Sequence, residues 1–123
     1  MTDIAIIYPH MRDELIRNLE KFPKYMDHAW ASTTSEKEKL FALDIAEDFF
    51  SDMFDERSPE TWIGKMLVSR DEVIAIDRFI SALKKFRETH GYELSPNRFN
   101  EIPEWSIVLT SAKDALSIIN KER

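Results

Sequence analysis

The stretch SEKEKLFALDIAEDFFSDMF, residues 35–54, has the pattern that decides the fold. Placed at 100° per residue, most of its apolar side chains fall on one half of a helix. We therefore predict an amphipathic helix that begins with a capping box formed by Ser35 and Glu38 and ends at Met53 or Phe54. The predicted core face consists of Ala42, Leu43, Ile45, Ala46, Phe49, Phe50, Met53 and Phe54.

The opposite face of this helix is acidic. Four aspartates lie in one line at i, i+4, i+8 and i+11, an aromatic residue falls in the same line, and one glutamate follows them: Phe41, Asp44, Asp48, Asp52, Asp55 and Glu56. Like charges four residues apart destabilise a helix by about 0.2–0.5 kcal/mol per pair. Most of these acids have no Lys or Arg four residues on to offset that cost. Such a face is either simply solvated or a docking surface for a basic partner.

The net charge of the chain has a local origin. Residues 44–60 hold seven acids and one base, whereas the remaining residues hold 16 acids and 16 bases, so the whole net charge of −6 arises in that stretch. Binding to nucleic acid or to anionic lipid requires a basic surface. We therefore expect neither a nucleic-acid nor a membrane partner.

Length and composition limit the class of protein. A chain of 123 residues is expected to form one domain, residues 1–123, with a core large enough to need no disulfide or structural metal. Cysteine is absent, which excludes disulfides and thiolate zinc sites. No apolar run is long enough to cross a membrane, and the N-terminus lacks the basic region of a signal peptide, so we expect a cytoplasmic protein.

Two further helices are predicted before residue 65. One begins at Pro9, which suits the first helical position, and ends at Pro23. A short helical segment follows at 24–31, with Trp30 pointing inward. Ser58 and Pro59 start a short turn that closes at Gly64.

The second half of the chain predicts two long helices. Ser69 and Glu72 form another capping box, and the helix after them reaches Thr89 or His90, with Gly91 as a left-handed C-cap. A polar connection, 94–102, leads to a last helix from Pro103 to about Asn120. The chain is therefore predicted to be an all-α, single-domain bundle of four main helices and one or two short ones.

Isoleucines outside the predicted core stripes are candidates for a self-association surface. Ile74 lies off the buried arc of its helix, and Ile107 and Ile118 share a second stripe on the last helix. That stripe contacts either a neighbouring short helix or a second subunit, so the chain is expected to be a monomer or a homodimer.

Motifs for catalysis or metal binding are missing from the sequence. His10, His28 and His90 are far apart, and neither HExxH nor ExxH occurs. The acidic line is helical and lacks the glycine of a calcium loop. Glu47 and Asp48 are adjacent and therefore diverge on a helix. We expect no metal and no cofactor, and a non-enzymatic protein; an enzyme assembled from residues that meet only in space is the alternative.

The order of motifs in residues 40–119 resembles a family of small uncharacterised all-helical bacterial proteins known chiefly from actinomycetes. The resemblance consists of an acidic-aromatic helix end, an aromatic-Ile-Gly turn, a Ser-x-x-Glu helix start and a Pro-x-Trp helix start: Asp48, Trp62, Ile63, Gly64, Ser69, Glu72, Pro103 and Trp105. It implies a helical fold and no particular activity. Small acidic cytosolic proteins of this kind are often immunity proteins encoded beside secreted toxins. Trp62 and Trp105 are expected to anchor the core, and Gly64 to supply a backbone angle that other residues avoid.

Three functional hypotheses follow. The first is a protein-binding domain, in its specific form a bacterial immunity protein that neutralises a cationic toxin, with Phe41, Asp44, Asp48, Asp52, Asp55 and Glu56 as the partner-binding residues. The second is a self-associating structural domain that uses Ile74, Ile107 or Ile118. The third is an enzyme or metal protein without a sequence signature.

Overall fold

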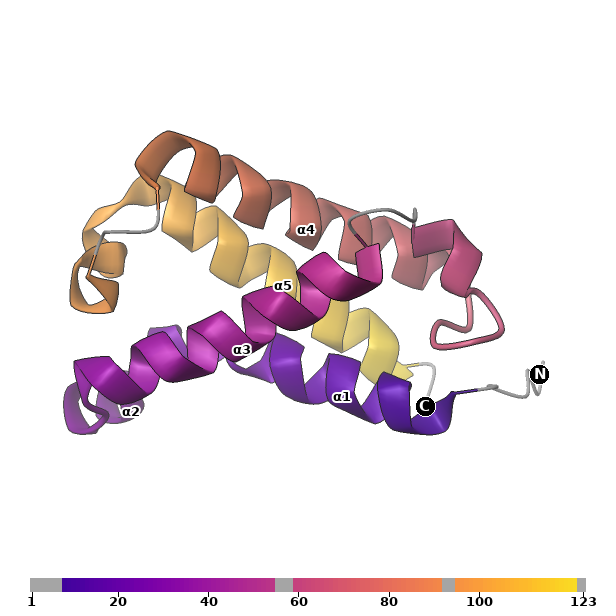
Figure 1. Ribbon diagram of the computed structural model, residues 1–123, viewed down its shortest axis with the longest axis horizontal. Coiled ribbons are helices and arrows are strands. Elements are labelled where there is room, and N and C mark those ends of the chain that lie inside the picture. The colour runs from indigo at the N-terminus through magenta and orange to yellow at the C-terminus, as the bar shows by residue number, and fades with distance from the viewer. Residues whose placement is uncertain (1–7, 55–58, 92–94, 122–123) are drawn as a thin grey trace.

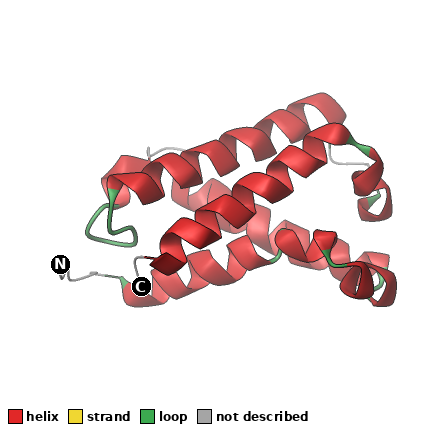
Figure 2. Cartoon of the chain, turned by 180° about the vertical axis from the view of Figure 1, so that it is seen from behind, coloured by secondary structure: helices red, strands yellow, loops and turns green. Residues whose placement is uncertain are grey.

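The computed structural model describes residues 8–54, 59–91 and 95–121, and these ranges are helical with short connections (Figures 1 and 2). The elements are α1 (Pro9–Glu20), η1 (Pro23–Met26), α2 (His28–Thr33), α3 (Glu36–Phe54), η2 (Pro59–Trp62), α4 (Arg70–His90), η3 (Pro96–Glu101) and α5 (Pro103–Lys121), where η marks a 3₁₀-helix. The described ranges contain no strand, only an isolated bridge between Ile63 and Leu67. The prediction of an all-α fold is confirmed.

The helix starts follow local chemistry. Pro9 opens α1, where its missing N–H would have no helical partner. The Ser35 hydroxyl accepts a hydrogen bond from the Glu38 N–H at 3.2 Å, and the Ser69 hydroxyl accepts one from the Glu72 N–H at 3.3 Å. These bonds satisfy amide groups that a helix leaves unpaired in its first turn.

Short helical segments are more numerous than predicted. The connection between α4 and α5, expected to be only polar, contains η3, and Phe99 within it is fully buried. The Phe99 ring lies 4.7 Å from Trp105 and 5.2 Å from Phe86, measured between centroids. Phe99 thus anchors the connection against the end of α4 and the start of α5. Its neighbours in the sequence are mostly polar, so the sequence pattern did not predict this contact.

The C-cap of α4 differs from the prediction. Gly91 has φ 72° and ψ −164°, so it is not in the left-handed helical conformation. This combination of angles is almost restricted to glycine. The Gly91 N–H still donates to the Arg87 carbonyl at 2.8 Å, which closes the last helical turn.

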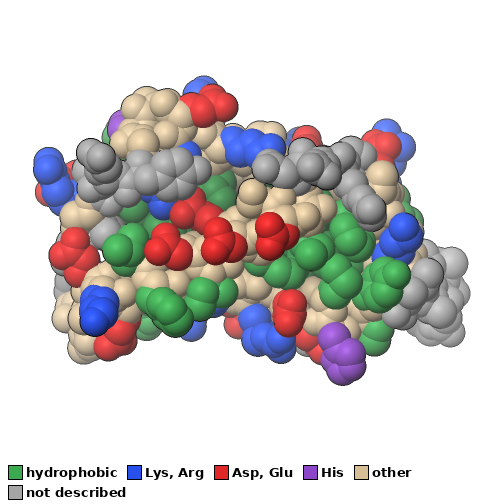
Figure 3. Space-filling model, in the orientation of Figure 1, with side chains coloured by type: hydrophobic (Ala, Val, Ile, Leu, Met, Phe, Trp, Pro, Cys, Tyr) green, Lys and Arg blue, Asp and Glu red, His purple; other side chains and the backbone are tan. Residues whose placement is uncertain are grey.

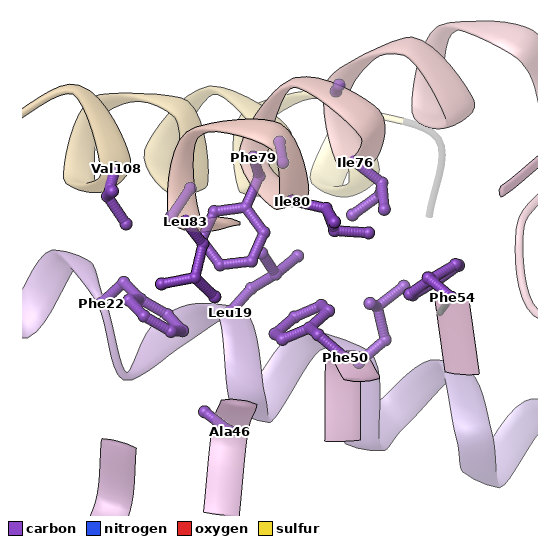
Figure 4. Packing of buried hydrophobic residues seen from close by; sticks show 14 of the residues in the cluster. Leu19, Phe22, Ala46, Phe50, Phe54, Ile76, Phe79, Ile80, Leu83 and Val108 are labelled. Atoms are coloured by element: carbon purple, nitrogen blue, oxygen red, sulfur yellow. The ribbon is translucent and has the colours of Figure 1, made fainter. Parts of the chain in front are cut away.

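The helices share one hydrophobic cluster. Figure 1 shows α4 and α5 side by side in opposite chain directions, with α1 packed on α5 and α3 lying across the bundle. At the centre, the Phe79 ring of α4 lies 4.9 Å from both Phe22 and Phe50. Figure 4 shows Phe50 reaching from α3 toward the α4 side chains Phe79, Ile80 and Leu83.

Helix α3 buries a narrower stripe than predicted. Its buried side chains are Lys39, Leu43, Ala46, Phe50 and Phe54, whereas Ile45, which we placed in the core face, is 43% exposed. The reason is geometric: α3 touches the bundle along one line, so residues far from the centre of its apolar arc remain at the surface. Phe49 and Met53 are partly buried and pack against the cluster.

Candidate partner-binding face on helix α3

The exposed side of α3 presents an aromatic ring among carboxylates. Phe41 is 68% exposed, and Asp44, Asp48 and Asp52 are also exposed. Asp55 and Glu56, which we predicted to belong to the same surface, lie outside the described residues. The structure therefore places four of the six predicted partner-binding residues in one line along α3.

Two more apolar side chains flank this line. Leu40 is 41% exposed and Ile45 is 43% exposed, so α3 provides three of the eight large hydrophobic side chains exposed in the described part of the chain. Figure 3 shows acidic side chains in a row over α3, with hydrophobic side chains beside them. We call this surface the α3 face and define it as Leu40, Phe41, Asp44, Ile45, Asp48 and Asp52.

A groove runs between α3 and α4 beside the α3 face. Its volume is about 340 Å³, and its walls and floor are formed by Glu47, Phe50, Ser51, Ile80, Leu83, Lys84, Arg87 and Glu88. Phe50, Ile80 and Leu83 make its floor apolar, while polar and charged side chains from both helices line its sides. The groove has the volume of a small ligand site and lies open at the surface.

A partly buried ion pair joins the two walls of the groove. The Arg87 guanidinium donates from Nε to Glu47 Oε1 at 2.6 Å and from Nη2 to Oε2 at 2.8 Å, and its Nη1 donates to the Gly91 carbonyl at 3.1 Å. The same guanidinium lies 5.6 Å from the centroids of the Phe86 and Phe99 rings. Bidentate geometry of this kind is the strongest form of ion pair, so the pair fastens α3 to the end of α4.

No pattern in the sequence predicts this ion pair between Glu47 and Arg87. Glu47 stands beside the acidic line, and its divergence from Asp48 on the helix argues only against a pair of catalytic carboxylates. Arg87 resembles an ordinary basic residue in the last turn of a helix. Only the approach of two helices 40 residues apart brings the two side chains together.

Tyr25 lies near the same pair. Burial raises the pKa of its hydroxyl far above the ordinary tyrosine value, while Arg87 lowers that pKa and Glu47 raises it. The hydroxyl donates to the Lys39 carbonyl at 3.4 Å. Tyr25 therefore remains neutral in the folded protein and acts as part of the core.

The remaining predicted site residues occupy structural positions. Trp62 is buried, and its indole N–H donates to the Met53 carbonyl at 3.0 Å, which ties η2 to the end of α3. Trp105 is 1% exposed at the centre of the aromatic cluster. Gly64 has φ 84°, a value that favours glycine.

The isoleucines proposed for self-association separate into two groups. Ile107 is 61% exposed and Ile74 is 44% exposed. Ile118 instead packs against the hydrophobic cluster. The predicted shared stripe of Ile107 and Ile118 is therefore not a single surface.

Acidic and histidine side chains do not converge in the part of the chain that the structure describes. In these ranges no three His, Asp or Glu side chains come close enough together to hold a metal ion. The Asp side chains of the α3 face follow the helix axis and so point outward side by side.

None of the helices within the described ranges has the length and apolar character needed to span a membrane.

Comparison with known proteins gives a match to one family. No curated protein and no solved structure matches the chain at a significant level. A family model described as "Domain of unknown function (DUF7945)" matches residues 6–123, and the chain therefore belongs to this family.

Proposed function

We propose that this protein is a non-enzymatic binding protein whose α3 face docks a basic protein partner. The observation that supports this most directly is Phe41, which is 68% exposed although it stands in a line of three exposed aspartates. A large aromatic side chain in a charged surround is a common arrangement at the centre of an interface. Most other phenylalanines of the described chain are buried.

The charges of the α3 face support a cationic partner. Asp44, Asp48 and Asp52 are neighbours at i, i+4 spacing, so their mutual repulsion destabilises the free helix. A basic surface placed against them relieves that repulsion and is steered toward them over a distance, which raises the rate of association. The flanking Leu40 and Ile45 offer apolar area that such a partner would cover.

In its specific form, the proposal is a bacterial immunity protein that acts in the cytoplasm and neutralises a cationic toxin, for which a nuclease domain is the natural case. The support for this form is the local concentration of negative charge and the resemblance of residues 40–119 to small bacterial helical proteins. An acidic face imitates the charge of the nucleic acid that a nuclease binds.

The test is a site-specific photocrosslink in the native host. A photoreactive phenylalanine analogue replaces Phe41, and a matched variant carries it at Ile74, which is exposed on α4. We expect position 41 to capture one basic protein, and Asp48→Lys/Asp52→Lys to abolish that capture. The control Asp77→Lys/Asp114→Lys changes the charge by the same amount on another surface and should leave it intact. Capture of the same proteins at both positions, or equal capture by both double variants, would contradict the proposal.

Self-association is the second candidate, supported by the exposure of Ile107 and Ile74. These residues lie on α5 and α4, away from the α3 face. Sedimentation at about 100 µM, well above a micromolar Kd, tests this candidate. A single monomeric species at that concentration would exclude it.

A further inference from the structure

The α3 face and the groove between α3 and α4 form one continuous surface. Leu40, Asp44, Glu47 and Ser51 follow one another at i, i+4, i+7 and i+11, so they share one edge of α3. Glu47 and Ser51 line the groove. Leu40 and Asp44 therefore extend the same edge toward the start of the helix, and a ligand that covers the aspartates also reaches the groove.

The two sides of this surface have different electrostatic character. The α3 side carries Asp44, Asp48 and Asp52, whereas the α4 wall carries Lys84 and Arg87 together with one acid, Glu88. Arg87 is engaged by Glu47, so its charge is compensated within the protein. Positive groups of a ligand are therefore favoured along the α3 side of this surface.

Backbone hydrogen bonding decides the conformation of the ligand. An extended segment buried here would need a strand edge to pair its N–H and C=O groups. The described elements that border the groove are helices, whose own backbone groups are already paired. In a helical ligand the backbone N–H and C=O groups are already hydrogen-bonded to one another. Such a ligand therefore loses no backbone hydrogen bond when the groove excludes water.

The spacing of the aspartates also favours a helical ligand. With a rise of about 1.5 Å per residue, Asp44, Asp48 and Asp52 stand about 6 Å apart along the axis. A second α-helix alongside α3 repeats that distance when its basic residues are also four apart. Its neighbouring apolar side chains then meet Leu40 and the groove floor formed by Phe50, Ile80 and Leu83.

We propose that the partner binds through an amphipathic basic α-helix that lies along α3, with its cations on the aspartates and its apolar side chains in the groove. This inference rests on the proposed function, because it specifies the segment of a basic partner that the α3 face recognises.

Synthetic peptides test the inference. One helical peptide of about 20 residues, long enough to cover α3, carries Lys at i, i+4 and i+8 beside a leucine stripe; a second has the same composition in scrambled order. We expect fluorescence anisotropy to show at least about tenfold tighter binding of the patterned peptide. Ser51→Trp, which fills the groove from an exposed position, should weaken its binding by a similar factor. Ser81→Trp, an exposed serine on α4 outside the groove, should not.

The outcomes separate this inference from the proposed function. Equal binding of the two peptides, or full binding by a folded Ser51→Trp protein, overturns the helix-in-groove inference, while a specific crosslink at position 41 still supports the proposed function. Loss of patterned-peptide binding in both Ser51→Trp and Asp48→Lys/Asp52→Lys supports the inference. Absence of any specific crosslink at position 41 overturns the proposed function itself. Circular dichroism confirms that each variant is folded.

Discussion

Arg12 and Glu72 form a bidentate ion pair in the interior of the protein, with Nη1–Oε1 and Nη2–Oε2 distances of 2.8 Å. Glu72 is 0% exposed. Arg12 Nη1 also donates to the Met66 carbonyl at 2.9 Å, and the Val68 N–H donates to Glu72 Oε1 at 2.9 Å. The pair thus joins α1, the segment before α4 and the first turn of α4 through groups that satisfy one another.

Removal of one partner of this pair should be strongly destabilising. We expect Glu72→Leu to lower the free energy of unfolding by about 3–5 kcal/mol, because Arg12 is left charged and buried without its counter-ion. The double variant Arg12→Met/Glu72→Leu should recover much of that loss, since both buried charges are then gone. Urea unfolding measures each value, and Asp71→Leu on the exposed side of the same turn is the control. A double variant no more stable than Glu72→Leu alone would contradict this account.

Gly91 should tolerate neither Ala nor Asn. A Cβ at this position would meet no atom within 4 Å, so any cost comes from the backbone angles alone. We expect Gly91→Ala to destabilise the protein by about 1–3 kcal/mol. Asn is tolerated in the left-handed helical conformation, but Gly91 does not have it, so Gly91→Asn should cost as much as Gly91→Ala. Thermal unfolding with Gly91→Asn near wild-type stability would show that the cap is left-handed after all.

The aspartates of the α3 face should reduce the stability of the free protein. Asp48→Asn removes the repulsion from Asp44 and from Asp52, so we expect it to raise the free energy of unfolding by about 0.5 kcal/mol at low salt. The gain should vanish near 1 M NaCl, where screening acts over about 3 Å. Asp114→Asn on α5 has no acid three or four residues away and should change little. A gain for Asp48→Asn that persists at high salt would have another cause than charge repulsion.

Tyr25 should make the protein sensitive to alkaline pH. Burial raises the pKa of its hydroxyl in the folded state, so the neutral form is favoured by folding. This contribution to stability is fully present below the unfolded tyrosine pKa of about 10 and is lost as the pH rises above it. The free energy of unfolding should therefore fall less between pH 8 and pH 11 in Tyr25→Phe than in the wild-type protein. Tyr8, which is exposed, provides the control Tyr8→Phe, and identical pH profiles for all three proteins would contradict the prediction.

Local patterns in the sequence determined the helices. The 3.6-residue period of residues 35–54, the Ser35 and Ser69 caps and the prolines at positions 9 and 103 each act within a few residues of the chain. The exposed line of Phe41, Asp44, Asp48 and Asp52 follows from the same period, since residues opposite a buried stripe must face outward. These features could be predicted because both their cause and their effect lie within one helix.

Only the tertiary structure decided which charges are buried and which apolar residues remain outside. Glu47 and Asp48 are neighbours in the sequence, yet Glu47 pairs with Arg87 in the wall of the groove while Asp48 is exposed. Ile45 belongs to the apolar half of its helix but stays 43% exposed. The physical reason is that burial and ion pairing depend on where a second helix approaches, and that approach is fixed by contacts between residues distant along the chain.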